Sequence, residues 1–311
     1  MVILKRSYKK AYLPVGDGCK LYYELYGNPN GKPVLFLHGG PGAGFLDEEK
    51  DFFNPKAYKV IFFDQRGAAR SKPFGSIKNN NTKKLVKDIT RILDYFKIKK
   101  ALLVGGSWGT TLALVYAIKH PERVSGLILR GVFLANDASI ADYTQGGVKK
   151  YEPKAWGRFI KQVPLAYRKD VLGYYFKQMH SKDKRIREKY LYEWAYYEFS
   201  IYKLKISDKE VRKALKKYSY RSLSILEVYY LKNRCFLPEN FIFKNTNKLS
   251  RIPISIIHGK FDRVCPMRFM KPFCKKVKHA KVYFVNAGHS ESEPEIKKKL
   301  ISEIKRFEKI V

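Results

Sequence analysis

The sequence predicts an α/β fold in which a mostly parallel sheet has helices on both faces and carries an inserted helical lobe. Short runs that are apolar on every side indicate buried parallel strands. Strands and amphipathic helices alternate along the first half of the chain, and a stretch of different texture separates the last strands from the others. With 311 residues, 45% of them hydrophobic, the chain can bury a full core, which excludes a disordered basic tail.

The first predicted elements are a hairpin and two buried strands. Residues 11–15 and 20–26 flank the dipeptide Asp17-Gly18, which is typical of a hairpin turn. The wholly apolar runs at 34–37 and 60–63 are expected to be strands of the parallel part of the sheet.

Helices and strands alternate in the next part of the chain. Apolar side chains recur at helical spacing over 82–96, which predicts an amphipathic crossover helix. A strand, a tight turn, a helix and a further strand are then expected over 101–104, 105–109, 110–119 and 124–129. This order predicts parallel strands joined by right-handed crossovers.

Residues 136–249 differ in composition from the rest of the chain. Tyr, Trp, Lys and Glu dominate there, and helical spacing replaces strand-like runs. We therefore predict a helical cap over 136–249, inserted into an α/β core formed by 1–135 and 250–311. The core is expected to resume with two strands and a charged helix, over 254–258, 282–285 and 293–309.

Positive charge is the most unusual feature of the composition. Lys and Arg number 63 against 28 Asp and Glu, which gives a formal charge of +35 with neutral histidines. An excess of this size suggests nucleic acid or an anionic membrane as a partner. The charges are spread along the whole chain, so we interpret them as solvated and expect neither a nucleic-acid nor a membrane partner.

The sequence favours a cytoplasmic protein. No stretch approaches the roughly 18 apolar residues of a membrane span, and no apolar run of signal-peptide length follows the charged residues 1–10. The cysteines lack the spacing of a zinc or redox motif and are expected to be free thiols: Cys19, Cys235, Cys265 and Cys274.

The sharpest chemical motif is Gly105-Gly106-Ser107-Trp108-Gly109, a G-x-S-x-G between a predicted strand and a predicted helix. In that setting the turn leaves no room for side chains at the flanking positions, and a strained serine presents its hydroxyl above the sheet. The context makes Ser107 the candidate nucleophile.

A serine nucleophile needs a base and an acid that orients the base. Asp262 and His289 each follow one of the last two predicted strands, in the chain order Ser, Asp, His that α/β-hydrolases use. We expect Ser107, Asp262 and His289 to form the triad, with Asp64 and Asp88 as other candidates for the acid. None of the other five histidines follows a terminal strand after a glycine.

Acyl transfer also needs N–H donors for the oxyanion, each worth a factor of about 100 to 1,000 in rate. The backbone of Trp108 is expected to supply one donor, and Gly39 or Gly40, in the loop after the strand at 34–37, the other. This chemistry requires no metal and no organic cofactor.

Several segments together resemble the proline iminopeptidase (prolyl aminopeptidase) family of α/β-hydrolases, which are serine peptidases. The core segments are His38-Gly39-Gly40-Pro41-Gly42, Asp64-Gln65-Arg66-Gly67, Gly105-Gly106-Ser107-Trp108-Gly109-Thr110-Thr111-Leu112-Ala113-Leu114 and Leu129-Arg130-Gly131-Val132-Phe133. The segments around Asp262 and His289 resemble that family's acid and histidine segments. The resemblance runs almost end to end and implies the α/β-hydrolase fold.

The resemblance extends into the predicted cap. Residues 194–198 resemble the family's W-x-x-W-E segment, and residues 225–230 its I-E-x-H-Y segment. An aminopeptidase must hold the protonated amine of its substrate, so the resemblance implies Glu198 and Glu227 as the binding carboxylates. A pyrrolidine ring would pack on aromatic side chains, for which the candidates are Trp108, Phe133 and Trp194. Departures from the family pattern at Ala69, Tyr197, Val228 and Tyr229 bear on the size of this pocket.

We therefore predict a serine exopeptidase that releases N-terminal proline from short peptides through an acyl-enzyme. A broader aminopeptidase or an esterase of the same fold would share the triad. Epoxide hydrolase chemistry is disfavoured, because it usually places Asp where Ser107 stands. An alternative of another class is a non-catalytic binder that uses the positive charge to hold nucleic acid or an acidic partner.

Overall fold

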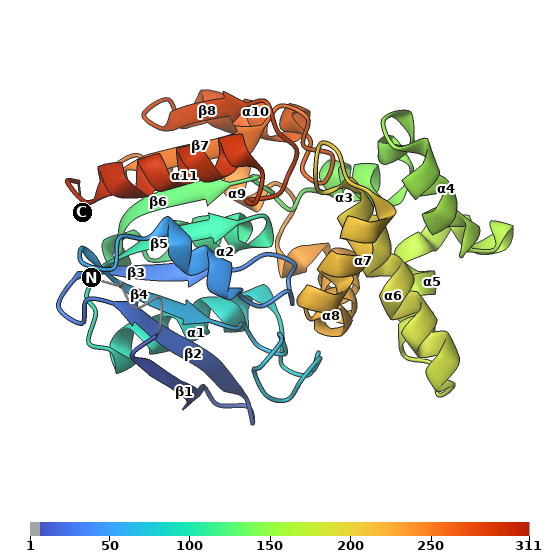
Figure 1. The fold of residues 1–311 in the computed structure, drawn as a ribbon, viewed down its shortest axis with the longest axis horizontal. Coiled ribbons are helices and arrows are strands. Elements are labelled where there is room, and N and C mark those ends of the chain that lie inside the picture. Colours follow the sequence, from blue (N-terminus) through green and yellow to red (C-terminus); the bar gives the residue numbers. More distant parts are fainter. Residues whose placement is uncertain (1–6, 311) are drawn as a thin grey trace.

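The computed structural model describes residues 7–310 and contains an eight-stranded sheet with helices on both faces (Figure 1). The strand order is β1-β2-β4-β3-β5-β6-β7-β8. Strands β3 to β8 run parallel to one another, whereas β2 pairs antiparallel with both β1 and β4. The predicted α/β-hydrolase class is confirmed. The expectation that the chain has no signal peptide rests partly on residues 1–10, most of which lie outside the described residues.

Every strand expected from the sequence is present. The strands are β1 (Lys9–Pro14), β2 (Lys20–Gly27), β3 (Lys32–Leu37), β4 (Tyr58–Phe63), β5 (Ala101–Gly106), β6 (Val124–Arg130), β7 (Ile254–Gly259) and β8 (Lys281–Val285). All six residues of β5 and all six of β7 are buried. Burial on both faces explains why these strands read as continuous apolar runs instead of alternating ones.

The core helices lie on the two faces of the sheet. They are α1 (Thr82–Tyr95), α2 (Trp108–Lys119), α10 (Met267–Lys276) and α11 (Pro294–Phe307). Helices α1, α2 and α10 share one apolar cluster with the sheet, and α11 shares the other. The sequence did not predict α10, because only Met270 and Phe273 of this lysine-rich helix are buried and Pro272 interrupts its pattern.

The chain leaves the sheet between β6 and β7, which are adjacent strands, and forms helices before it returns. These are α3 (Asp137–Thr144), α4 (Pro153–Lys161), α5 (Val171–Met179), α6 (Lys184–Ile201), α7 (Asp208–Lys217), α8 (Tyr220–Lys232) and α9 (Phe241–Lys244). In Figure 1, α4, α5 and α6 lie away from the sheet. Helix α9 contacts α2 of the core. The cap boundaries at 136 and 249 stay a prediction.

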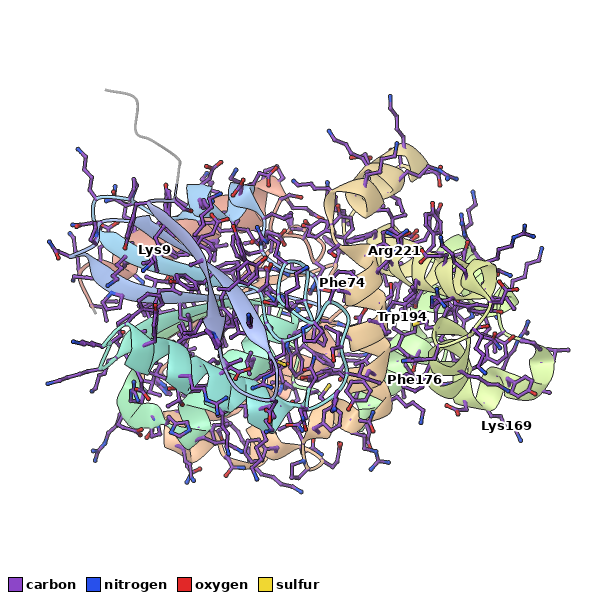
Figure 2. The ribbon with its side chains drawn as sticks, turned by 90° about the horizontal axis from the view of Figure 1, so that it is seen from below. Lys9, Phe74, Lys169, Phe176, Trp194 and Arg221 are labelled. Carbon is purple, nitrogen blue, oxygen red and sulfur yellow. The ribbon has the colours of Figure 1, made fainter. Side chains whose placement is uncertain are left out.

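Long side chains with nitrogen at their ends surround the molecule on all sides in Figure 2. The labelled Lys9 lies on the core and Lys169 at the far end of the helical lobe. The positive charge is thus distributed over both parts. Within the residues described, no helix combines the length and the apolar character that a membrane span requires.

Candidate active site

Ser107 occupies a strained turn between β5 and α2. Its backbone has φ 55° and ψ −125°, outside the regions that a residue with a side chain normally adopts. A Cβ added to Gly109 would collide with the carbonyl oxygen of Leu37, and one added to Gly105 would lie 2.5 Å from the carbonyl oxygen of Gly109. The two outer glycines of the motif are therefore required by close backbone packing.

His289 and Asp262, from the ends of β8 and β7, form a hydrogen bond. His289 Nδ1 lies 2.7 Å from Asp262 Oδ2, while Asp262 Oδ1 accepts from the backbone N–H groups of Val264 (3.0 Å) and Cys265 (2.7 Å). Burial alone would raise the pKa of Asp262, but the charge of His289 and its hydrogen bond outweigh burial and hold this pKa below its usual value. Asp262 therefore stays ionised beside the imidazole.

Arg130 contacts the other side of the His289 ring. Its Nη1 lies 3.2 Å from His289 Nε2 and donates to the His289 carbonyl oxygen at 3.1 Å. A guanidinium can only donate, so Nε2 accepts this bond and the imidazole proton stays on Nδ1, facing Asp262. This is the tautomer that a general base needs. Among the residues described, Arg130 is the side chain bonded to Nε2, so this nitrogen does not accept from Ser107 in the structure.

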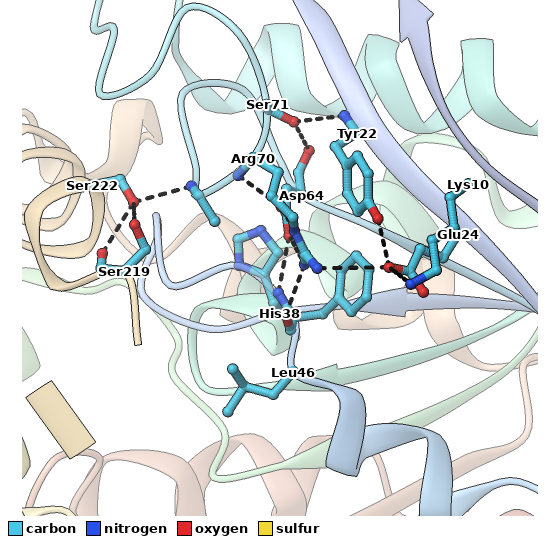
Figure 3. A network of polar contacts seen from close by, with 12 residues as sticks. Lys10, Tyr22, Glu24, His38, Leu46, Asp64, Arg70, Ser71, Ser219 and Ser222 are labelled. Carbon is cyan, nitrogen blue, oxygen red and sulfur yellow. Dashed lines mark hydrogen bonds and ion pairs between the residues drawn. The ribbon is translucent and has the colours of Figure 1, made fainter. Parts of the chain in front are cut away.

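Asp64 and Asp88, the other candidates for the acid, are engaged elsewhere. Asp64 accepts from Arg70 Nε at 2.7 Å and from the backbone of Phe45 at 3.0 Å (Figure 3). Asp88 forms a buried ion pair with Arg66. Both carboxylates hold loops of the core in place.

The loop after β3 brings Gly39 next to Ser107. A Cβ added to Gly39 would lie 3.3 Å from Ser107 Cβ and 3.9 Å from its Oγ, and Gly40 lines the pocket that contains Ser107. Trp108 is the first residue of α2, so its N–H has no partner within the helix. The three residues that were candidates for the two oxyanion donors therefore lie around Ser107.

Residues of the Asp64-Gln65-Arg66-Gly67 segment support this loop. The backbone N–H of Gln65 donates to His38 Nε2 at 2.9 Å, and the side-chain amide nitrogen of Gln65 donates to the His38 carbonyl oxygen, also at 2.9 Å. The indole N–H of Trp108 donates to Gln65 Oε1, also at 2.9 Å. Ser222 of α8 donates to the carbonyl oxygen of Gly42 at 2.8 Å, which ties the cap to the same loop.

A narrow pocket opens at Ser107 between the core and the helices of the cap. The volume of the pocket, measured as the space open to the centre of a water molecule, is about 20 Å³. This is room for about one water molecule. Its core side includes Gly40, Phe133 and Cys265, and its cap side is formed by α3 and α8. Glu227 lies in the cap wall and faces the same space as Ser107.

Two carboxyl groups lie together at the cap side of this pocket. Glu227 Oε2 accepts a 2.6 Å hydrogen bond from the indole N–H of Trp194. Burial, and then the charge of Glu198 and a hydrogen bond to it, raise the pKa of Glu227 well above its usual value. Burial also raises the pKa of Glu198. Carboxyl groups in this arrangement share a proton and carry about one negative charge between them.

Two buried polar atoms, one in this pair and one next to it, lack hydrogen-bond partners among the residues described. They are Glu198 Oε2 and the hydroxyl of Tyr143. Buried polar atoms are nearly always hydrogen-bonded in proteins, so a pair of unsatisfied atoms at a pocket indicates a place for a ligand with N–H groups. Tyr143, from α3, lines the pocket.

Of the aromatic candidates, Phe133 lines the pocket. Trp194 and Trp108 are fully buried behind it, where their indoles hold Glu227 and Gln65. Sequence reasoning did not single out Tyr143 or Arg130 as site residues. Arg130 lies in one of the segments that resemble the family, so the sequence offered a reason to consider it as a site residue. No local pattern in the sequence points to Tyr143.

The comparison with family profiles defines the class. The profile described as alpha/beta hydrolase fold matches residues 32–293. The chain belongs to this fold family, in agreement with the sheet order and with the serine turn at the end of β5.

Curated relatives narrow the assignment. The chain is 35% identical over 308 residues to the proline iminopeptidase of Neisseria meningitidis, covering 98% of this chain and 97% of that protein. It is 36% identical over 297 residues to the proline iminopeptidase of Arabidopsis thaliana, covering 94% and 78%. The chain belongs to the proline iminopeptidase family, as its sequence segments suggested.

Solved structures show the same fold at lower identity. An esterase from Exiguobacterium antarcticum superposes with a TM-score of 0.64 at 21% identity, covering 97% of this chain and 100% of the esterase. Proline iminopeptidase from Mycobacterium smegmatis superposes with a TM-score of 0.60 at 16% identity, covering 96% and 99%. At these identities the likeness concerns the fold alone.

Proposed function

We propose that this protein is a serine aminopeptidase that releases N-terminal proline from peptides. The observation that carries the proposal is the buried pair of Glu198 and Glu227 next to the pocket of Ser107. The curated relatives named above are proline iminopeptidases. A simple ester offers no cation to such a pair, so the pair favours a peptidase over an esterase.

The proposed reaction begins when Arg130 releases His289 Nε2. The imidazole then takes the proton of Ser107 Oγ, which attacks the carbonyl carbon of the terminal proline, and Asp262 stabilises the imidazolium. The N–H groups of Trp108 and of Gly39 or Gly40 receive the oxyanion. His289 passes its proton to the nitrogen of the leaving chain as the C–N bond breaks. Water, deprotonated by His289, hydrolyses the prolyl ester and restores Ser107.

The glutamate pair would select the amino terminus. The secondary ammonium of a terminal proline carries two N–H groups and one positive charge. Glu198 Oε2 supplies an unused acceptor, and the single negative charge shared by the two carboxyl groups balances the ammonium. A peptide bond inside a longer chain has no such charge, so it would leave this negative charge buried and uncompensated.

Seating a proline ring requires the pocket to widen, because its present volume admits about one water. Most of the movable wall belongs to α3 and α8, which contribute Ile140, Tyr143, Glu227 and Leu231. We therefore propose that α3 and α8 shift when substrate binds and return on release, as lids do in other hydrolytic enzymes.

Replacing Glu198 and Glu227 together by glutamine tests the amine site, because a single substitution would leave the other carboxyl group to carry the shared negative charge. We expect kcat/KM for a prolyl arylamide to fall by about 100-fold, since a charge-assisted interaction worth about 3 kcal/mol is lost. Hydrolysis of an acetate ester, which has no amine, should change less than threefold. Glu295→Gln, at an exposed position of α11, is the matched control. An equal loss on the arylamide and on the ester would refute the amine-binding role.

The raised pKa of Glu227 predicts how amine binding depends on pH. A carboxyl group with a raised pKa becomes neutral at a higher pH than usual, so its attraction for a cation is lost early as the pH falls. Pyrrolidine stays cationic throughout this pH range. As the pH falls, its inhibition constant should therefore begin to rise at a higher pH than it would if an ordinary glutamate bound the amine. In Glu227→Gln the midpoint should move to lower pH, because Glu198 no longer faces a second carboxylate. A constant independent of pH between 5 and 8 would contradict this assignment.

A further inference from the structure

A second cavity lies beside the catalytic histidine and shares no lining residue with the Ser107 pocket. Its volume is about 330 Å³, at the small end of the range of about 300 to 1,000 Å³ for ligand sites. Lysines from the cap and from α11 line it, together with the segment after His289, and we call it the lysine cavity: Lys203, Lys213, Lys217, Lys297, Tyr218 and Glu291.

Two hydrogen bonds join the lysine cavity to the reacting end of His289. Glu291 Oε2 accepts from Arg130 Nη2 at 2.8 Å, and Arg130 Nη1 lies 3.2 Å from His289 Nε2. The backbone N–H groups of His289 and Ser290 donate to the carbonyl oxygen of Tyr202, another residue of the cavity wall. Because His289 Nε2 protonates the departing nitrogen, the chain that leaves starts next to this wall.

The acidic side chains of the cavity are already engaged. Glu48 pairs with Lys217 at 2.8 Å, and Glu291 accepts from Arg130 and from the hydroxyl of Tyr218. The carboxylate of Glu210 accepts from Ser207 at the start of α7. Burial, followed by the charge of Glu291, raises the pKa of Glu49 well above its usual value.

Three ammonium groups form no close ion pair among the residues described, and the single carboxylate of Glu210 acts electrostatically on two of them, Lys203 and Lys213. Lys203, Lys213 and Lys297 belong to no ion pair within the part of the chain that the structure describes. Cations that line one concave surface favour an anionic ligand. In a di- or tripeptide the carboxylate lies one or two residues beyond the scissile bond, at about 3.5 Å for each extended residue.

We propose that the lysine cavity binds the C-terminal carboxylate of short peptides, and thereby selects di- and tripeptides that begin with proline. The proposal rests on the proposed function. The amine is held by the glutamate pair on one side of Ser107, and the carboxylate by the lysines on the other. The lysines would act on binding and on the position of the leaving chain, and take no part in the chemistry.

The test compares prolyl-alanine with its C-terminal amide, which differs only in lacking the carboxylate. We expect the wild-type protein to have a kcat/KM at least tenfold higher for the free acid, mainly through KM, and this preference should decrease as NaCl is added. In Lys203→Ala/Lys213→Ala the ratio of acid to amide should fall to about one. Lys216→Ala, on α7 but outside the lysine cavity, should keep the wild-type ratio.

A wild-type protein that cleaves the acid and the amide equally well would overturn the proposal, as would a double variant that keeps the wild-type ratio. If the proposed function itself is wrong, the wild-type protein will cleave neither dipeptide nor a prolyl arylamide. The two failures are therefore distinguishable. Retention of the acid preference at high salt would also count against binding by the lysines.

Discussion

Ser107→Ala is expected to lower kcat on a prolyl arylamide by about 10⁴- to 10⁶-fold, because no other group can form the acyl-enzyme. The remaining rate over water would come from substrate binding and from the oxyanion donors alone. The substitution removes one oxygen from a half-buried side chain, so the folded structure should persist. Steady-state kinetics and thermal unfolding, measured on the same preparations, check both statements.

Labelling provides a second readout for Ser107. A fluorophosphonate should modify the wild-type protein at Ser107, as located by mass spectrometry, and should leave Ser107→Ala unlabelled. Ser250→Ala, at an exposed serine in the segment before β7, is the matched control and should react and turn over like the wild type. If Ser107→Ala kept even a hundredth of the activity, a different nucleophile would have to be sought.

Asp262→Asn is expected to lower kcat by about 10⁴-fold while the protein stays folded. An asparagine side chain would still offer its carbonyl oxygen to the N–H groups of Val264 and Cys265, which Oδ1 holds now. Its NH₂ group would then face His289 Nδ1 and could only donate to it. The imidazole proton would be driven to Nε2, where it prevents the ring from accepting the proton of Ser107.

The control for Asp262 is a carboxylate with no link to the ring. Asp94→Asn breaks an exposed ion pair with Arg123, which should alter stability by less than about 1 kcal/mol and leave turnover as it is. A loss of less than tenfold in Asp262→Asn, with His289 still required, would mean that another acid orients the imidazole.

The elements of the fold could be predicted well because their signals are local. Residues 60–63 are all apolar, which indicates a strand buried on both faces. Apolar side chains recur at helical spacing over residues 82–96, which indicates a helix with one buried face. The helix α10 was missed for the same reason, since it buries two side chains and exposes a lysine-rich surface. When a helix buries only a few side chains, the apolar repeat is too weak to predict it from the sequence, and the helix is recognised only from its packing against the sheet.

The sequence by itself determined the candidate nucleophile and the order of its partners. A G-x-S-x-G between a strand and a helix is a local constraint on the backbone, and Asp262 and His289 follow neighbouring strands. The tertiary structure decided which side chains meet around them. Arg130 reaches His289 Nε2 across 159 positions of the chain. Tyr143 lies beside the glutamate pair with its hydroxyl unsatisfied among the residues described. Contacts of this kind leave no periodic trace in the sequence, since they depend on how the cap packs over the sheet and on which polar groups are buried there.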